Sequence, residues 1–360
     1  MKNVLILCLH RPNRSPSQRF RFEQYLDYLS EHSYDFDFSY LLNEKDDKLY
    51  YQPGKYLQKA GIVLKSIFKR LNNILHAKKY DLIFIQREAF MLGTAFFEKA
   101  ISKRSPMIFD FDDAIWIHNV SKGNKSVSFL KNSEKTNKIT QAANMVFAGN
   151  QFLADYASKF NKNVVIVPAT VDTEVYKKKE TGNGDTICIG WSGSITTIEH
   201  FATAIPALQK IKELYGSKVG FKIIGDGNYY CKELETQGDP WNLTTEVRDI
   251  AELDIGIMPL PDTEWAKGKC GLKGLQYMSM GIPTLMSPVG VNTKIIKNGV
   301  NGFLPYTEQE WVDYLSLLVE DKNLRFNIGE AARATVVKEY SVNAWKDKYL
   351  EYFNLLTNRN

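Results

Sequence analysis

Residues 186–194 read TICIGWSGS, an apolar run that passes directly into a turn of small residues. The run predicts a buried strand, and the small residues predict a tight turn before the next helix. Comparable apolar runs follow at 220–224, 255–259, 284–287 and 302–304. An earlier series lies at 4–9, 82–85, 107–111 and 144–148, with a helix expected near 18–30. Because helical patterns separate the runs in both series, the sequence predicts the α/β class with two doubly wound, Rossmann-like domains.

Length and composition agree with two globular domains. The 360 residues exceed one ordinary hydrophobic core and suit two domains of similar size. The segment 167–172, VPATVD, followed by a stretch rich in lysine and glycine, is the expected linker. We therefore expect one domain over 1–168 and a second over 169–341.

Charge and cysteine usage limit the possible partners and compartment. The net charge of +5 suits phosphate-bearing ligands or an anionic lipid surface, but it is too small to indicate nucleic acid. No apolar run reaches the roughly 18 residues that a membrane span needs, so we expect any membrane contact to be peripheral. The four cysteines are scattered, without histidines at metal-ligand spacing, and indicate reduced thiols in the cytoplasm.

Two glycine-containing turns follow expected strands and are candidate donor-binding segments. Gly193 and Ser194 follow the first strand of the second series, and the segment 225–227, Gly225-Asp226-Gly227, follows the next strand. Backbone N–H groups at such turns can receive a diphosphate. The alternative is that both are simple tight turns. The spacing G-x-G-x-x-G follows no strand, which disfavours a dinucleotide site.

The segment 265–283 reads WAKGKCGLKGLQYMSMGIP and is the most informative candidate. A helix beginning near Gly271 and Leu272 would place Lys273 and Gln276 on one face, with Lys269 just ahead of the first turn. Two ammonium groups and an amide beside a helix N-terminus suit a diphosphate with a ribose beyond it. The alternative is a solvated lysine face. These residues complete the predicted donor site.

An acidic cluster ends an expected strand in the first half, where 109–116 reads FDFDDAIW. Asp112 and Asp113 lie at or near the carboxyl end of this strand, where a paired carboxylate could accept a hydrogen bond or a proton from an acceptor hydroxyl. The alternatives are a structural cap and a metal site, which is disfavoured because clustered partner ligands are absent.

Two basic segments of the first half could contact anions. Arg19 and Arg21 open the first expected helix and are candidate acceptor-binding residues, although Arg19 could instead pair with Glu23 at the surface. The segment 56–79 has a helical pattern with a lysine-rich side that could lie on an anionic membrane, or the helix could simply pack on the sheet. Its expected buried residues are Leu57, Leu64, Ile67, Phe68, Leu71 and Leu75.

The order of segments resembles family 4 of the retaining GT-B glycosyltransferases over nearly the whole chain. The matching segments are 167–172, Gly225-Asp226-Gly227, Asp254-Ile255-Gly256, 278–283 and NGVNGF at 298–303. The resemblance implies two Rossmann-like domains facing across a cleft, with the acceptor on 1–168 and a nucleotide sugar on 169–341. It also implies a helix within 342–360 that crosses back to the first domain.

The chain departs from this family in the donor segment. Gln276 stands where the family usually has a glutamate that holds the donor ribose, and Gly268 stands where a second glutamate lies near the active centre. Glutamine keeps an acceptor oxygen but loses the charge. The basic pair that the family uses for the diphosphate has no match after Ser192, and Lys269 and Lys273 are the expected substitutes.

The resemblance implies transfer of a sugar to a glycan or lipid-linked acceptor in polysaccharide assembly, with retention and without a covalent enzyme intermediate. Asp112 and Asp113 lie near the place of an active-site histidine in many relatives, which makes them the catalytic candidates. We expect no metal and no cofactor, because lysines and helix N-termini would stabilise the departing nucleoside diphosphate. Two alternatives stay open: a GT-B-fold nucleotide-sugar epimerase, and a catalytically silent GT-B partner subunit.

Overall fold

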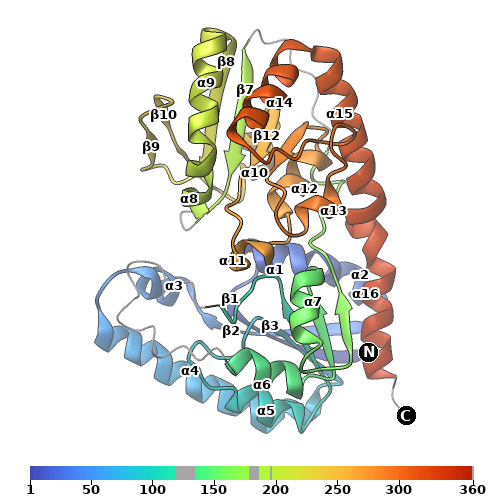
Figure 1. Ribbon diagram of the computed structural model, residues 1–360. Helices are drawn as coiled ribbons and strands as arrows, with labels where there is room; N and C mark the ends of the chain where they lie inside the picture. Colours follow the sequence, from blue (N-terminus) through green and yellow to red (C-terminus); the bar gives the residue numbers. More distant parts are fainter. Residues whose placement is uncertain (118–133, 178–185, 195–196, 359–360) are drawn as a thin grey trace. The chain divides into compact units, whose positions relative to one another are not determined.

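The computed structural model describes residues 1–117, 134–177, 186–194 and 197–358 and divides the chain into two compact units (Figure 1). The first unit combines Met1–Ala169 with Lys346–Asn360, and the second is Thr170–Trp345. Each unit has a parallel sheet with helices around it, which confirms the predicted α/β class with two Rossmann-like domains. None of the helices in the described segments combines the length and the apolar composition that a membrane span requires.

The sheet of the first unit has six parallel strands in the order β2-β1-β3-β4-β5-β6. Four of them, β1, β3, β4 and β5, coincide with predicted runs, and their side chains form the buried core. The other two, β2 and β6, lie at the edges and were not predicted. The bounds are β1 (Lys2–His10), β2 (Tyr34–Leu42), β3 (Leu82–Gln86), β4 (Met107–Phe111), β5 (Met145–Ala148) and β6 (Val164–Ile166).

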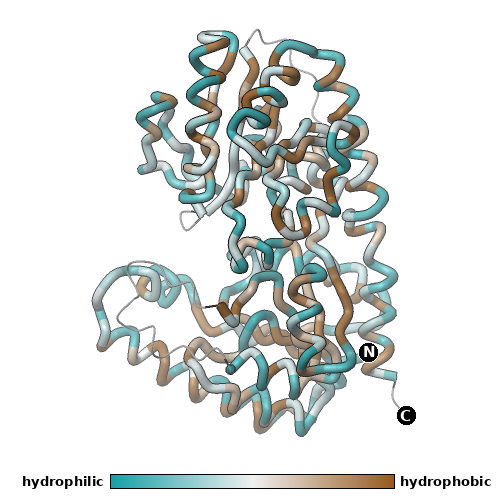
Figure 2. The backbone as a smooth tube through the Cα atoms, in the orientation of Figure 1, coloured by the Kyte–Doolittle hydropathy of each residue, from teal (hydrophilic) through white to brown (hydrophobic). Residues whose placement is uncertain are grey.

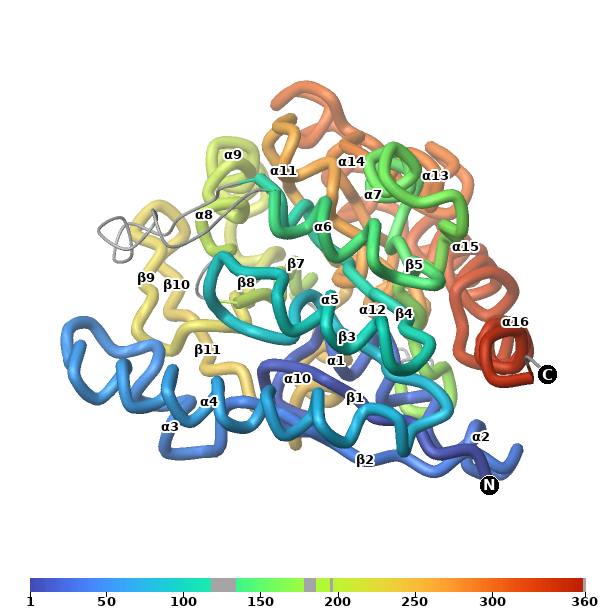
Figure 3. Tube along the Cα trace, turned by 90° about the horizontal axis from the view of Figure 1, so that it is seen from below, coloured from blue at the N-terminus to red at the C-terminus, as the bar shows by residue number. Residues whose placement is uncertain are grey.

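The helix expected near 18–30 is divided into two short helices by a 3₁₀ turn at Glu23–Tyr25. The last helix of the chain also packs in this unit, since the ring of Tyr349 stacks on that of Tyr25 with centroids 4.3 Å apart. The helices are α1 (Pro16–Arg21), α2 (Leu26–Glu31), α3 (Glu44–Tyr51), α4 (Tyr56–His76), α5 (Phe96–Ser102), α6 (Glu134–Ala142), α7 (Gln151–Ala157) and α16 (Val342–Thr357). In Figure 3, α3 and α4 lie beside β2.

One expectation for this unit is wrong: α4 does not bury its apolar stripe. Most of the side chains expected inside are exposed, with Leu57 at 91% and Phe68 at 70%. The helix turns Ser66, Arg70 and Asn73 inward, together with Ile62 and Ile74. The cause is a set of hydrogen bonds from the Arg70 guanidinium to backbone carbonyl oxygens of the unit, which require a polar face on the buried side.

The second unit has a five-stranded parallel sheet in the order β11-β8-β7-β12-β13 and a separate two-stranded ladder, β9 with β10. The predicted runs at 186–191, 220–224, 255–259 and 284–287 correspond to strands, but 302–304 forms only two isolated bridges, Phe303 with Leu285 and Gly302 with Asn298. The bounds are β7 (Ile187–Ser192), β8 (Val219–Gly225), β9 (Tyr230–Cys231), β10 (Thr236–Gln237), β11 (Asp239–Pro240), β12 (Ile255–Met258) and β13 (Thr284–Met286).

Helices α9 and α14 contact each other and contribute to a core built around the fully buried Trp191. Thr307 and Glu310 form a reciprocal capping box at the start of α14. The helices are α8 (Ile198–Phe201), α9 (Ile205–Tyr215), α10 (Glu246–Ala251), α11 (Glu264–Lys267), α12 (Leu272–Ser279), α13 (Asn292–Ile295), α14 (Glu308–Glu320) and α15 (Lys322–Thr335).

Candidate functional site

In the first unit the carboxyl ends of β1, β3 and β4 lie side by side, because these strands are neighbours and parallel. The residues that follow them therefore gather at one edge of the sheet. Arg87, directly after β3, has a left-handed backbone with φ of 62°, and its N–H donates to the carbonyl of Asp110 at 2.7 Å. Such a backbone is uncommon outside glycine and directs the side chain of Arg87 toward the residues after β4.

Arg87 joins the two predicted catalytic carboxylates into one network. Its Nε lies 2.9 Å from Oδ1 of Asp112, and its terminal nitrogen lies 2.6 Å from Oδ2 of Asp113. The hydroxyl of Ser17 also donates to Asp112, at 2.7 Å. Burial opposes ionisation of Asp112, but the Arg87 and Arg21 cations outweigh it and hold the pKa of that carboxyl below its usual value. Asp112 is therefore suited to accept a hydrogen bond and is a weak proton acceptor.

The two candidate acceptor-binding arginines occupy different environments. Arg21 is 1% exposed and pairs inside the unit with the fully buried Asp110, with Nε 3.1 Å from Oδ1. Its guanidinium also donates to the carbonyl of Val167. The predicted role of Arg21 in acceptor binding does not fit this position, because the buried pair already uses its charge. Arg19 is half-buried, and its guanidinium lies 4.9 Å from the ring centroid of Phe20.

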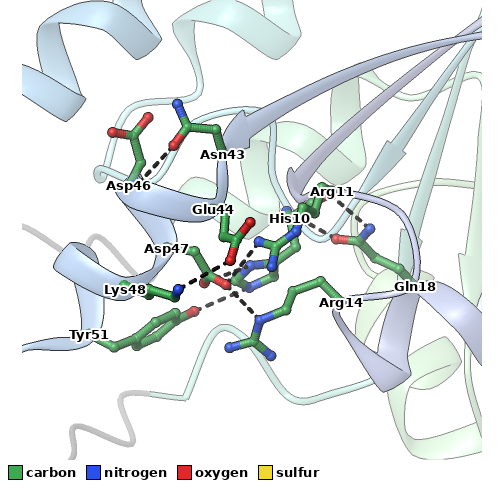
Figure 4. Close-up of polar contacts among 10 residues, drawn as sticks. All are labelled: His10, Arg11, Arg14, Gln18, Asn43, Glu44, Asp46, Asp47, Lys48 and Tyr51. Carbon is green, nitrogen blue, oxygen red and sulfur yellow. Dashed lines mark hydrogen bonds and ion pairs between the residues drawn. The ribbon is translucent and has the colours of Figure 1, made fainter. Parts of the chain in front are cut away.

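A second polar cluster at this edge was not predicted and is centred on His10, the last residue of β1 (Figure 4). The imidazole Nε2 lies 3.1 Å from the hydroxyl of Tyr51, and Nδ1 lies 3.5 Å from Oδ1 of Asp47. Asp47 also accepts from Arg11 at 3.2 Å and from Arg14 at 2.6 Å. Burial, with the nearby arginines, lowers the pKa of His10 to about 4 against the opposing effect of Asp47. The imidazole is therefore neutral near pH 7.

Two consecutive residues of α1 connect these clusters. Ser17 donates to Asp112, and the side chain of Gln18 exchanges two hydrogen bonds with the backbone of His10, at 3.0 and 3.1 Å. Gln86 supports the arrangement by donating to the hydroxyl of Ser17 at 2.7 Å. The edge thus presents a cation-paired carboxylate and a neutral imidazole whose positions are set by one short helix.

In the second unit the two small-residue segments form closely hydrogen-bonded turns. The N–H of Gly193 donates to the carbonyl of Ile224 at 2.9 Å, and the N–H of Ser194 donates to Oγ1 of Thr197 at 3.1 Å. A side chain at Gly225 would overlap the carbonyl of Gly193. These contacts support the tight-turn alternative, because two N–H groups considered for a diphosphate already have protein partners.

Asp226 and Gly227 continue the second turn. Oδ1 of Asp226 accepts from the N–H of Asn228 at 2.9 Å, which is the local bond that an Asx turn makes. The carbonyl of Gly227 accepts from the side-chain amide of Gln237 at 2.7 Å. Both residues therefore act in shaping the loop after β8.

The predicted helix in the donor segment is confirmed as α12, which begins at Leu272. Gly271, at the N-cap, has φ of 72°, and a side chain there would overlap Ile295. Both lysines lie over aromatic rings: Nζ of Lys269 is 3.6 Å from the ring centroid of Trp265, and Nζ of Lys273 is 4.7 Å from that of Trp191. The lysines are half-buried, so they do not form the fully solvated face of the alternative interpretation.

Gln276 lies in a separate, buried network. It is 4% exposed, and its Nε2 is 3.1 Å from the hydroxyl of Tyr176 and 3.4 Å from Oε1 of Glu246. Glu246, 5% exposed, also accepts from Tyr176 at 2.8 Å and from Trp241 at 3.0 Å. The amide of Gln276 thus points into the unit, and sequence analysis did not identify Glu246 as its partner.

A cavity of about 360 Å³ lies beyond the carboxyl ends of β12 and β13. Ser287 and Val289 from the segment after β13 line it, together with Leu260 after β12 and Trp311 of α14. The position is the edge of a parallel sheet at which ligands usually bind. None of the residues that line this cavity was predicted to bind the donor.

The comparisons with known proteins agree with this architecture. The family model "Glycosyl transferases group 1" matches residues 186–321, which lie within the second unit. None of the curated proteins matches the sequence. A glycosyltransferase from Rickettsia africae is similar in structure, with a TM-score of 0.71, 15% identity and coverage of 100% of both chains.

Two further solved structures have the same fold. HepE from Anabaena, solved in complex with UDP and glucose, has a TM-score of 0.65 and 15% identity and covers 99% of this chain and 100% of its own. The sucrose-phosphate synthase from Thermosynechococcus elongatus has a TM-score of 0.71 and 11% identity, with the same coverage. The chain therefore has the two-domain fold of the GT-B glycosyltransferases, and its second unit contains the segment that the group 1 family model matches.

Proposed function

We propose that the chain transfers a sugar from a nucleotide-sugar donor to a glycan or lipid-linked acceptor in the assembly of a cell-surface polysaccharide, with retention at the anomeric carbon. The observation that carries the proposal is the pair of half-buried lysines at the start of α12, Lys269 and Lys273. Two ammonium groups beside a helix N-terminus suit the charge of a nucleoside diphosphate. The family-model match over the same segment supports a donor of this kind.

The proposed chemistry is electrostatic. The two lysines and the N-terminus of α12 stabilise the departing diphosphate, whose oxygen assists in deprotonating the acceptor hydroxyl. Asp112 and Asp113, paired with Arg87, accept hydrogen bonds from the acceptor, and Arg19 contributes positive charge. The first unit thus provides the acceptor side. The reaction needs no metal, so a chelator should leave turnover unchanged.

The compartment proposed for this reaction is the cytoplasm. It is supported by the cysteines, all four of which lie in described segments and none of which is joined by a disulfide. A nucleotide-sugar donor fits the same compartment.

Calorimetric titration with UDP and GDP tests the donor site. We expect micromolar binding of one nucleotide to the intact protein and at least tenfold weaker binding to Lys273→Ala, a loss of about 1.4 kcal/mol. Lys218→Ala is the matched control. This exposed lysine directly precedes β8 and therefore lies at the amino ends of the strands, away from the carboxyl ends where the donor is proposed to bind. Equal weakening by both variants would attribute the effect to net charge rather than to the site.

Nucleotide titration and activity assays on the same protein distinguish the two alternative functions. Failure of both nucleotides to bind would favour a catalytically silent partner subunit. Release of a free sugar epimer from the donor, without any acceptor, would favour an epimerase. Transfer to an acceptor with the donor's anomeric configuration kept is the outcome that the proposal requires.

A further inference from the structure

Helix α4 exposes a continuous row of large apolar side chains. The row consists of Leu57, Leu64, Phe68, Leu71 and Leu75, which we call the apolar stripe. Their exposed fractions are 91, 56, 70, 39 and 75%. Steps of seven, four, three and four residues keep all five within about 60° around an α-helix. Figure 2 shows apolar residues recurring along the length of α4. The stripe is therefore one surface and not a set of scattered residues.

The opposite face of α4 is buried and carries polar as well as apolar side chains, and its polar contacts hold the stripe outward. The guanidinium of Arg70 is fully buried and donates to the carbonyls of Ser39 at 2.8 Å and Cys8 at 3.1 Å, and also to Oδ1 of Asn73 at 3.0 Å. Asn73 in turn accepts from the hydroxyl of Ser39 at 2.8 Å. Rotating the helix to bury the stripe would remove these bonds and expose a different set of groups. The exposure of the stripe is thus built into the packing.

The charged residues of the α4 segment itself have one sign. The segment 51–80 contains seven lysines and arginines and no aspartate or glutamate. Lys55 and Lys59 lie at the first turn of α4, and Lys78 and Lys79 follow its last turn. Nζ of Lys59 donates to the backbone carbonyl of Gln52 at 2.6 Å, a partner that carries no charge. Lys65 is different, because it pairs with Asp46 of α3 at 2.8 Å. Positive charge therefore remains at both ends of the stripe.

We propose that α4 lies in the plane of an anionic membrane surface, with the apolar stripe among the acyl chains and the terminal lysines at the lipid phosphates. The helix has 21 residues and is about 30 Å long, and because it would lie in the membrane plane, both of its ends would be at the headgroup layer. The stripe spacing would also suit a partner helix, but such a seam is usually flanked by both signs of charge, and 51–80 has one. The membrane would hold the lipid-linked acceptor. This inference therefore rests on one part of the proposed function, the lipid-linked acceptor, and not on the nucleotide-sugar donor.

Co-sedimentation of the full chain with vesicles tests the proposal. We expect at least tenfold stronger binding to vesicles of phosphatidylcholine with 30% phosphatidylglycerol than to pure phosphatidylcholine, and weaker binding in 0.5 M salt. A stripe variant, Leu64→Ser with Phe68→Ser and Leu75→Ser, should bind at least tenfold less. The matched control carries Leu214→Ser, Leu317→Ser and Leu355→Ser, three exposed helical leucines elsewhere, and should bind as the wild type does.

Depth of insertion gives a second measurement. The chain has six tryptophans of its own, so the spectrum of the wild type is subtracted from that of Phe68→Trp; the difference should shift to the blue with the anionic vesicles and not with the neutral ones. Equal binding to both kinds of vesicle, or unchanged binding of the stripe variant, would overturn the proposal. It would also be overturned if the wild type were a dimer without vesicle binding and the stripe variant a monomer. Calorimetry with nucleotide on the same variants separates the two proposals, because lost nucleotide binding with intact vesicle binding contradicts only the proposed function.

Discussion

Replacing Gln276 with glutamate should make the stability of the second unit strongly dependent on pH. The substitution keeps the shape of the side chain but turns an amide donor, 3.4 Å from Oε1 of Glu246, into a carboxylate oxygen. Both positions are about 5% exposed or less. Two unit charges at this distance repel by about 5 kcal/mol at an effective dielectric constant near 20. Uptake of a proton by the pair limits the cost, which we place at about 2–4 kcal/mol near pH 8.

The direction of the pH dependence follows from linkage. The carboxyl of Gln276→Glu would have a higher pKa in the folded protein than in the unfolded chain, because ionisation brings two negative charges together. Below the pKa of a glutamate in the unfolded chain, about 4.3, the variant should be as stable as the wild type. Its stability should then fall as the pH rises through the folded pKa. Urea denaturation of both proteins at pH 4.5, 6 and 8, followed by tryptophan fluorescence, gives this difference directly.

The exchange variant Glu246→Gln with Gln276→Glu is the control, since it restores one carboxylate and one amide. It should recover at least half of the loss at pH 8. A loss in Gln276→Glu that is the same at every pH would refute the reasoning. Nucleotide affinity provides a separate check. Because the side chain at this position points inward, the variant should not bind UDP or GDP more tightly, whereas a ribose-binding role would predict tighter binding.

Three further predictions concern other parts of the chain. The imidazole of His10 should titrate in an NMR experiment with a midpoint near its lowered pKa of about 4. Because this pKa lies below the unfolded value, the free energy of unfolding should fall as the pH decreases from about 6.5 through 4. A midpoint above 6 would contradict this. Gly329→Ala should lower the free energy of unfolding by about 2 kcal/mol, since the new methyl group would overlap the carbonyl of Gly281. In Gly61→Ala of α4 the new methyl group meets open space, so this variant should be more stable by about 0.5–1 kcal/mol. Thermal melts compare the two variants with the wild type. Arg87→Met should reduce transfer at least tenfold in a radiolabelled-donor assay, because it removes the larger of the two cationic effects, from Arg87 and Arg21, that lower the pKa of Asp112. Unchanged turnover would exclude this role.

The sheets could be predicted wherever a strand is buried on both faces. Apolar runs marked the central strands of both units, because covered parallel strands are continuously hydrophobic. The segment 34–42, YDFDFSYLL, was missed since β2 is an edge strand whose aspartates reach solvent. The run at 302–304 was predicted as a strand but is not one, because it makes only isolated bridges, from Phe303 to Leu285 and from Gly302 to Asn298, and no continuous ladder.

The candidate site was only partly predictable because its residues come from several strands. Asp112 could be found from its own strand end. Arg87 and His10 reach the same edge through the strand order β1-β3-β4, which local patterns do not contain. The left-handed backbone of Arg87 leaves no mark in its residue type, unlike a glycine. Asp47 comes from α3, and nothing in its spacing connects it with His10.

Helix α4 shows what a periodic pattern decides and what it leaves open. The period of 3.6 residues correctly grouped Leu64, Phe68 and Leu75 on one face, but it contains no information on which face meets the sheet. That choice depends on backbone carbonyls, such as that of Ser39, which need a donor once they are buried. Arg70 supplies several donors in a fixed fork, and burial lowers its pKa only to about 10, so it stays charged near pH 7. An arginine in the middle of the buried face therefore anchors the helix with that face inward. The apolar stripe then stays exposed, where only a nonaqueous surface could cover it.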